Sequence, residues 1–123
     1  MIDYPRNKER IMDTQVEEYI KNYPEKIARM FYSLRCAVLE SALPEPAEVM
    51  WAKLPSYYAG ESFVRLIPFQ DHINIEAKAL ALHMDELAGY RLTPKGMLQI
   101  YINQEIPAAL KRIFAQTLAD RSL

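Results

Sequence analysis

The sequence has very little cysteine, glycine or histidine, and each shortage excludes a class of chemistry. Its single cysteine, Cys36, can form neither an internal disulfide nor a thiolate metal cluster. The three glycines, at positions 60, 89 and 96, lie too far apart for a phosphate-binding loop or a dinucleotide fingerprint. No serine stands in a nucleophile elbow or has a histidine nearby in the sequence. We therefore expect a protein that is not an enzyme and that holds no tightly bound cofactor.

Long apolar runs and an excess of one charge are also missing. No stretch approaches the ~18 apolar residues of a membrane span, and the first ten residues lack the apolar centre of a signal peptide. The net charge is -1, so no overall field attracts nucleic acid or an anionic membrane. We expect a cytoplasmic protein with no nucleic-acid or membrane partner, and the sequence leaves monomer and homodimer both open.

Strand-like patterns are concentrated in the middle of the chain. The expected strands are Glu48–Leu54, Ser62–Pro68, His72–Glu76 and, later, Met97–Ile102. Pro55 cannot donate to a ladder and is expected to close the first strand, while Gly60 suits a tight hairpin before the second. The third strand alternates cleanly, with Ile73 and Ile75 on one face. Short turns between the first three runs predict a three-stranded antiparallel meander with one buried face and one polar face.

Helical patterns lie before and after these strands. The expected helices run from Thr14 to about residue 22, over Glu25–Ala42, over Ala77–Leu87, and onward from Pro107. Thr14 and Glu17 fit a capping box at the first start. The order is α-α-β-β-β-α-β-α, which predicts an α+β fold with helices on one face of a mainly antiparallel sheet of about four strands. We expect one domain at residues 14–123.

Residues 1–13 are expected to form an N-terminal extension. It contains a small basic cluster made of Arg6, Lys8 and Arg10. Acidic residues are interspersed with this cluster, which favours a solvated extension over an anion-binding or nucleic-acid-binding arm.

The polar face of the sheet is the first candidate site. His72, Asn74 and Glu76 should project together from one strand, and Gln99 and Tyr101 join them if their strands are neighbours. Trp51, Lys53 and Arg65 add an aromatic ring and cations if the register allows. Such a surface would suit a small anionic or planar ligand. The simpler interpretation is an ordinary half-exposed face with cross-strand pairs.

Acidic residues around the first helix are the second candidate site. They are Asp13, Glu17, Glu18 and Glu25. Carboxylates bind hard cations and iron weakly when several converge. The alternative is that these acids simply favour helix N-termini. His83 and Glu86, three residues apart, could share a metal, although a histidine within an apolar helical stripe also explains the pattern.

Several short motifs follow one another in a fixed order over residues 15–119. They are Val16-Glu17-Glu18-Tyr19-Ile20 leading to Pro24; Leu34-Arg35; Pro44, then Glu48 and Leu54-Pro55-Ser56-Tyr57; His72-Ile73; Tyr90 with Lys95-Gly96; and Ile106-Pro107. In this order they resemble the YdhG-like family of small bacterial proteins, which includes frataxin-like iron chaperones. The resemblance implies an α+β fold, in agreement with the strand and helix patterns.

The resemblance also implies a function for the acidic residues. In the iron-binding members, surface carboxylates would hold weakly bound iron and deliver it to iron-receiving proteins. Ala52 and Lys53 depart from the family pattern, and the cation of Lys53 disfavours a metal site on the sheet. Two hypotheses follow. One is an iron chaperone that uses the acidic residues, and the other is a small-ligand-binding or protein-interaction module that uses the polar sheet face.

Overall fold

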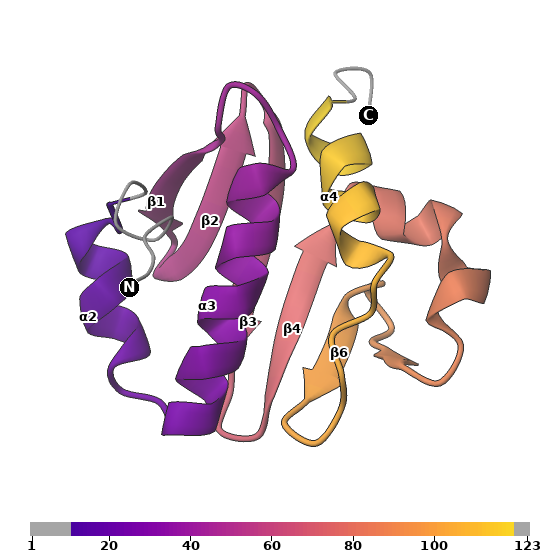
Figure 1. The fold of residues 1–123 in the computed structure, drawn as a ribbon, viewed down its shortest axis with the longest axis horizontal. Coiled ribbons are helices and arrows are strands. Elements are labelled where there is room, and N and C mark those ends of the chain that lie inside the picture. The colour runs from indigo at the N-terminus through magenta and orange to yellow at the C-terminus, as the bar shows by residue number, and fades with distance from the viewer. Residues whose placement is uncertain (1–10, 120–123) are drawn as a thin grey trace, which may run out of the picture.

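A six-stranded antiparallel sheet forms the centre of the fold in the computed structural model, which describes residues 11–119 (Figure 1). The strands are β1 (Ala47–Trp51), β2 (Leu54–Ala59), β3 (Ser62–Pro68), β4 (His72–Ala77), β5 (Arg91–Leu92) and β6 (Leu98–Tyr101). Their order across the sheet is β1-β2-β3-β4-β6-β5. The first four strands therefore form an antiparallel meander with one strand more than the sequence predicts, and the last two extend it beyond β4.

Three α-helices are present in the described chain: α2 (Thr14–Ile20), α3 (Glu25–Glu40) and α4 (Leu110–Ala119). The helices α3 and α4 lie side by side against one face of the sheet, and α2 contacts β1 (Figure 1). The fold is thus α+β, with helices before and after the strands. No helix of residues 11–119 is long and apolar enough to cross a membrane.

The core lies between the sheet and the helices. The expected stripe of α3, made of Ile27, Phe31, Leu34 and Val38, is fully buried. The stripe of α4, made of Leu110, Ile113, Phe114 and Leu118, is buried as well. On the sheet, the alternate residues Leu66, Ile73, Ile75, Leu98 and Ile100 have no exposed surface. Period-two burial in the strands and helical periodicity in the helices therefore supply the two sides of one core.

The prediction of about four strands was too low, and the first expected strand is a hairpin. Its turn is Ala52-Lys53, and both residues have positive φ angles, 50° and 67°. A two-residue turn of this kind normally uses Asn-Gly, so Ala-Lys gave no signal in the sequence. Pro55 does not close a strand but lies inside β2, where its pairing with β1 is kept. This is tolerated because the pairing of β2 with β3 begins only at Ser56.

The region between β4 and β6 also differs from the prediction. The expected α-helix Ala77–Leu87 is two short 3-10 helices, η1 (Lys78–Leu82) and η2 (Met84–Leu87). They are separated at His83, whose φ of -131° is not helical. Leu80 and Leu87 of the expected stripe are buried, but Met84 is 53% exposed, so the stripe is too incomplete to hold one helix against the core.

The start of α2 is set by Asp13 rather than by Thr14. The Oδ1 atom of Asp13 accepts hydrogen bonds from the backbone N–H groups of Gln15 and Val16. The backbone N–H of Asp13 donates to Glu48 Oε1 at 2.8 Å, and Met12 packs against the core. These two residues of the expected extension therefore contact the domain, while the basic cluster at positions 6, 8 and 10 lies outside the described residues.

A buried charged network joins α3 to the sheet. Arg35 Nε donates to Glu48 Oε2 at 2.6 Å, and the Tyr57 hydroxyl donates to the same oxygen at 2.7 Å. The side chains of Arg35 and Glu48 are only 4% and 8% exposed. Burial, together with the negative charge of Glu48, raises the pKa of Tyr57 well above its usual value, so the hydroxyl keeps its proton. Arg35, Glu48 and Tyr57, which all belong to the motifs that resemble the YdhG-like family, thus meet in one structural network.

Candidate functional site

The sheet face opposite α3 and α4 is covered by no helix of the described chain, and we call it the open face. Its residues are the strand positions that alternate with the buried ones, and the register aligns them across the sheet. They are Val49, Trp51, Ser56, Tyr58, Phe63, Arg65, Ile67, His72, Asn74, Glu76, Gln99 and Tyr101.

Arg65 organises one half of the open face. Its guanidinium carbon lies 4.1 Å from the Trp51 ring centroid and 4.0 Å from that of Phe63. Its nitrogens donate to the Ser56 hydroxyl at 2.9 Å, the Tyr58 hydroxyl at 2.8 Å and Glu76 Oε1 at 3.0 Å. The guanidinium is therefore stacked, hydrogen-bonded and neutralised. It holds the aromatic rings in place and is not a free anion site.

A stack of three rings forms the other half of the open face. The rings of Phe69 and His72 lie 4.6 Å apart and nearly parallel, at 7°. On the other side of His72, the Tyr101 ring lies 4.6 Å away at 24°. Asp71 Oδ1 lies 2.7 Å from His72 Nδ1 and fixes the orientation of the imidazole. The cross-strand pairing of His72 with Tyr101 brings these rings together.

Asn74 lies between these two halves. On β4 its neighbours on the same face are His72 and Glu76, and across the sheet it faces Ile67 and Gln99. The residue is 9% exposed, and its Oδ1 atom is buried without a hydrogen-bond partner. No hydrogen bond joins the side-chain amide of Asn74 to another residue of 11–119. A buried carbonyl oxygen without a hydrogen-bond partner costs about 1–3 kcal/mol.

The open face also exposes several large apolar side chains. Trp51 is 51% exposed, Phe69 42% and Val49 38%. Tyr58, Phe63 and other rings of the face are half-buried. Exposed aromatic side chains that gather on one sheet face are typical of an interaction surface.

All five predicted ligand-binding residues lie on the open face. They are Trp51, Arg65, His72, Asn74 and Tyr101. Lys53 does not join them, because it lies in the turn between β1 and β2. The sequence interpretation missed Tyr58, Phe63 and Phe69. The alternation of β2 and β3 would have shown the first two, had the Ala52-Lys53 turn been recognised.

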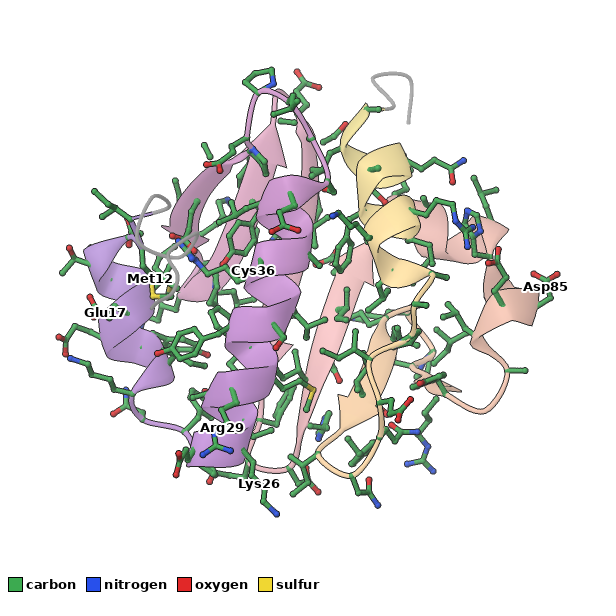
Figure 2. The ribbon with its side chains drawn as sticks, viewed as in Figure 1. Met12, Glu17, Lys26, Arg29, Cys36 and Asp85 are labelled. Carbon is green, nitrogen blue, oxygen red and sulfur yellow. The ribbon has the colours of Figure 1, made fainter. Side chains whose placement is uncertain are left out.

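Three of the four predicted acidic ligands are engaged in local helix contacts. Asp13 caps α2, and Glu18 pairs with Lys21 at 3.5 Å. Glu25 pairs with Arg29 on the exposed side of α3. Figure 2 shows Glu17 on the outer side of α2, away from Lys26 and Arg29 at the start of α3. Within residues 11–119, no three His, Cys, Asp or Glu side chains are grouped as metal ligands.

His83 and Glu86 do meet, as part of a surface cluster that joins η1 and η2 to α4. His83 Nδ1 lies 2.7 Å from Glu86 Oε2, and His83 Nε2 lies 2.7 Å from Gln116 Oε1. Arg112 pairs with Glu86 at 2.9 Å. The hydrogen bonds of Arg112 and His83 lower the pKa of Glu86 to about 2, and the hydrogen bond of Glu86 raises the pKa of His83. This network of hydrogen bonds and ion pairs connects η1 and η2 to α4, and we call it the clasp.

Comparison of the chain with protein-family models, with curated proteins and with solved structures found no match in any of the three. The resemblance to the YdhG-like family therefore stays a prediction from the motifs quoted above. The function has to be inferred from the geometry of the site.

Proposed function

We propose that this chain is a non-enzymatic module that binds a small planar ligand on the open face of its sheet. Three features support this. The rings of Trp51 and Tyr101 are accessible on either side of the face. Stacking contacts hold neighbouring rings in fixed positions. A flat surface of oriented rings favours a ligand that is itself flat, because stacking requires parallel or tilted planes.

The observation that carries the proposal is the unpaired amide of Asn74. An amide offers both a donor and an acceptor, which is the pattern that the edge of a heterocyclic ring requires. Its position between the Arg65 cluster and the His72 stack places that hydrogen-bonding group between two stacking surfaces. A bound ligand would supply the hydrogen bond that the Asn74 side chain lacks in the free protein, and so would remove the free-energy cost of leaving it unpaired.

The charge of the face sets the class of ligand. Arg65 is paired with Glu76, so this pair adds no net charge to the surface. The face therefore suits a neutral or weakly charged planar molecule. His72 contacts Asp71 and the rings of Phe69 and Tyr101. It therefore offers a ligand an aromatic surface to stack on rather than a free positive charge.

Iron binding is a separate hypothesis and rests on the family resemblance alone. It predicts that the purified chain binds ferrous iron and that Glu17→Ala with Glu18→Ala removes this binding. Anaerobic calorimetric titration with ferrous iron, with magnesium and zinc as controls, measures it. The geometry favours the open face instead, because the stacked rings there converge, whereas Asp13, Glu18 and Glu25 are each held in a separate local contact.

The experiment that tests the proposed function is a titration of the ¹⁵N-labelled chain with adenosine, nicotinamide, riboflavin and indole, followed by NMR. The reporter is the indole N–H resonance of Trp51, the only tryptophan. We expect at least one of these compounds to shift this resonance together with the amide signals of β4 and β6. Tyr101→Ala and Asn74→Leu should weaken that binding, whereas Tyr32→Ala, an exposed ring on α3, should not.

Asn74→Leu separates a binding role from a structural one. If the amide serves a ligand, replacing it with an apolar side chain removes a desolvation cost, and the fold gains about 1 kcal/mol of stability while binding is lost. If the amide is needed for the fold, the same variant loses stability. The proposal is wrong if none of the four compounds shifts the β4 and β6 signals, or if Asn74→Leu binds as well as the unmodified chain.

A further inference from the structure

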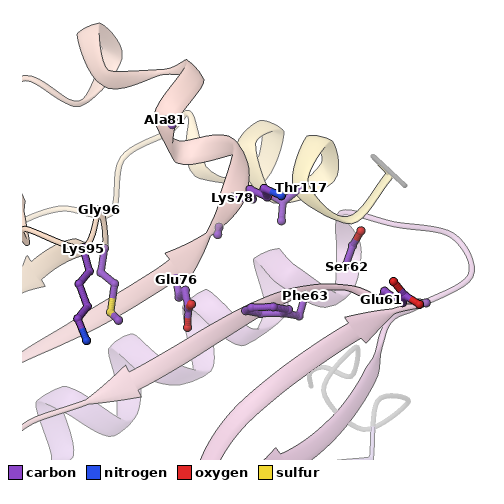
Figure 3. A pocket seen from close by; sticks show the side chains of 12 residues that line it. Glu61, Ser62, Phe63, Glu76, Lys78, Ala81, Lys95, Gly96 and Thr117 are labelled. Carbon is purple, nitrogen blue, oxygen red and sulfur yellow. The ribbon is translucent and has the colours of Figure 1, made fainter. Parts of the chain in front are cut away.

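A separate cavity lies at one end of the sheet, where β3 begins and β4 ends. Its volume is about 790 Å³, which is within the range of small-molecule sites. Four segments far apart in the sequence surround it: the β2–β3 turn with the start of β3, the end of β4 with η1, the turn before β6, and α4. Figure 3 shows this cavity from close by.

Part of the cavity wall is apolar. Phe63, Ala77, Ala81 and Met97 contribute to the lining. The Phe63 ring has a fixed orientation because one of its faces is stacked on the guanidinium of Arg65. A ring held in this way offers an ordered surface to the body of a ligand, and Met97 can adapt its shape to it.

Two lysines supply positive charge to the same cavity. Lys78 is the first residue of η1, and Lys95 lies in the turn before β6. Both are exposed, and neither has a hydrogen bond or ion pair with any other residue of the described chain. Figure 3 labels both lysines, with Glu76 and Thr117, among the side chains that line the cavity.

The carboxylates of the lining do not cancel this charge. Glu76 forms an ion pair with Arg65, in which Glu76 Oε1 lies 3.0 Å from Arg65 Nη1. Glu61, in the β2–β3 turn, is the remaining acid. With Glu76 neutralised by Arg65, the two lysines and the Glu61 carboxylate leave one net positive charge in the lining. This charge matches a ligand with one negative charge.

We propose that this cavity binds a small aromatic monocarboxylate, whose ring packs on Phe63 and Met97 and whose carboxylate is attracted by Lys78 and Lys95. The site is distinct from the stacking surface around Asn74 and Tyr101. It shares Phe63 and Glu76 with the open face, but its two lysines and its other lining residues lie outside that face, and it does not depend on the function proposed there.

The test is a titration of the full ¹⁵N-labelled chain with 1-naphthoate, with 1-naphthalenemethanol as the neutral analogue of the same size. We expect naphthoate to shift the amide signals of Gly60, Gly96 and Met97 in a saturable manner. The alcohol should bind at least about fivefold more weakly, because it lacks the charge that the lysines attract. Lys78→Gln with Lys95→Gln should reduce naphthoate binding to the level of the alcohol.

Lys53→Gln is the matched control, since Lys53 is an exposed turn lysine outside the cavity. It should leave naphthoate binding unchanged, as should Asn74→Leu. Equal affinity for the acid and the alcohol, or full binding by the double lysine variant, would overturn the proposal. Absence of any saturable shift at Gly60 and Gly96 would overturn it as well. Loss of naphthoate binding in Asn74→Leu would show that the acid occupies the open face and not this cavity.

Discussion

The Arg65 guanidinium lies over the Trp51 indole, with its central carbon 4.1 Å from the ring centroid. The contact joins β3 to β1 across β2, so it bridges strands that are not hydrogen-bonded to each other. Arg65 is 6% exposed while Trp51 is 51% exposed. The tryptophan thus shields a paired cation from water and still offers one side of its ring to solvent.

Arg65→Lys is expected to destabilise the fold more than Trp51→Ala. An ammonium group cannot reproduce the fork that reaches Ser56, Tyr58 and Glu76, and the loss should be about 1–3 kcal/mol. Removing the tryptophan deletes one cation–π contact, at about 1 kcal/mol. Urea unfolding measures both changes. Arg29→Lys, at an exposed pair, is the control and should change stability by less than about 0.5 kcal/mol.

Glu48→Gln is expected to cost about 3–5 kcal/mol, because the buried Arg35 guanidinium loses the negative charge of Glu48. The Tyr57 hydroxyl and the Asp13 N–H also lose a charged acceptor. Guanidinium unfolding gives the size of the loss. The matched control is Glu18→Gln, whose pair with Lys21 is exposed and should contribute little. Similar losses in the two variants would show that the buried network is not a stabilising feature.

Ala52→Asn with Lys53→Gly is expected to stabilise the chain by about 1 kcal/mol or more. Both residues have positive φ angles, and the Cβ atoms of alanine and lysine are strained there, whereas Asn-Gly is the preferred pair for such a turn. Thermal unfolding should show a higher midpoint. Lys53→Ala keeps the Cβ atom and should therefore have no such effect. A lower midpoint for the Asn-Gly variant would show that the turn is not strained.

The contribution of His83 to stability is expected to depend on pH. Its pKa is raised in the folded chain, chiefly by the Glu86 hydrogen bond, so the protonated form favours folding. This contribution is fully present below the unfolded pKa of about 6.5 and is lost as the pH rises through the folded pKa. Glu86, with its pKa lowered to about 2, contributes above its unfolded value and loses this as the pH falls toward about 2.

The measurement compares the free energy of unfolding of the unmodified chain with that of His83→Gln at about pH 5.5 and about pH 8.5. The difference between the two proteins should be larger at the lower pH. Groups other than His83 titrate alike in both proteins and largely cancel in the comparison. A difference that is independent of pH, or larger at the higher pH, would show that protonated His83 does not stabilise the clasp.

The sequence alone determined the helices that pack on the core and the alternation of β4. Apolar residues at three- and four-residue steps, as in Ile27, Phe31 and Leu34, can be buried together only on a helix. Strict alternation from His72 to Glu76 likewise separates a buried face from a polar one. These are local periodicities, so they are visible in the sequence without knowledge of strand order.

Only the tertiary structure decided where the strands turn and which rings meet. The hairpin at Ala52-Lys53 has no turn signal because packing of β1 on β2, not local preference, holds its strained angles. The stack of His72 on Tyr101 and the contact of Arg65 with Trp51 depend on register between distant segments. Periodicity places a residue on a face but does not specify its cross-strand neighbour. For that reason, the sequence predicted members of the open face, while the arrangement that makes it a site emerged only from the pairing of six strands.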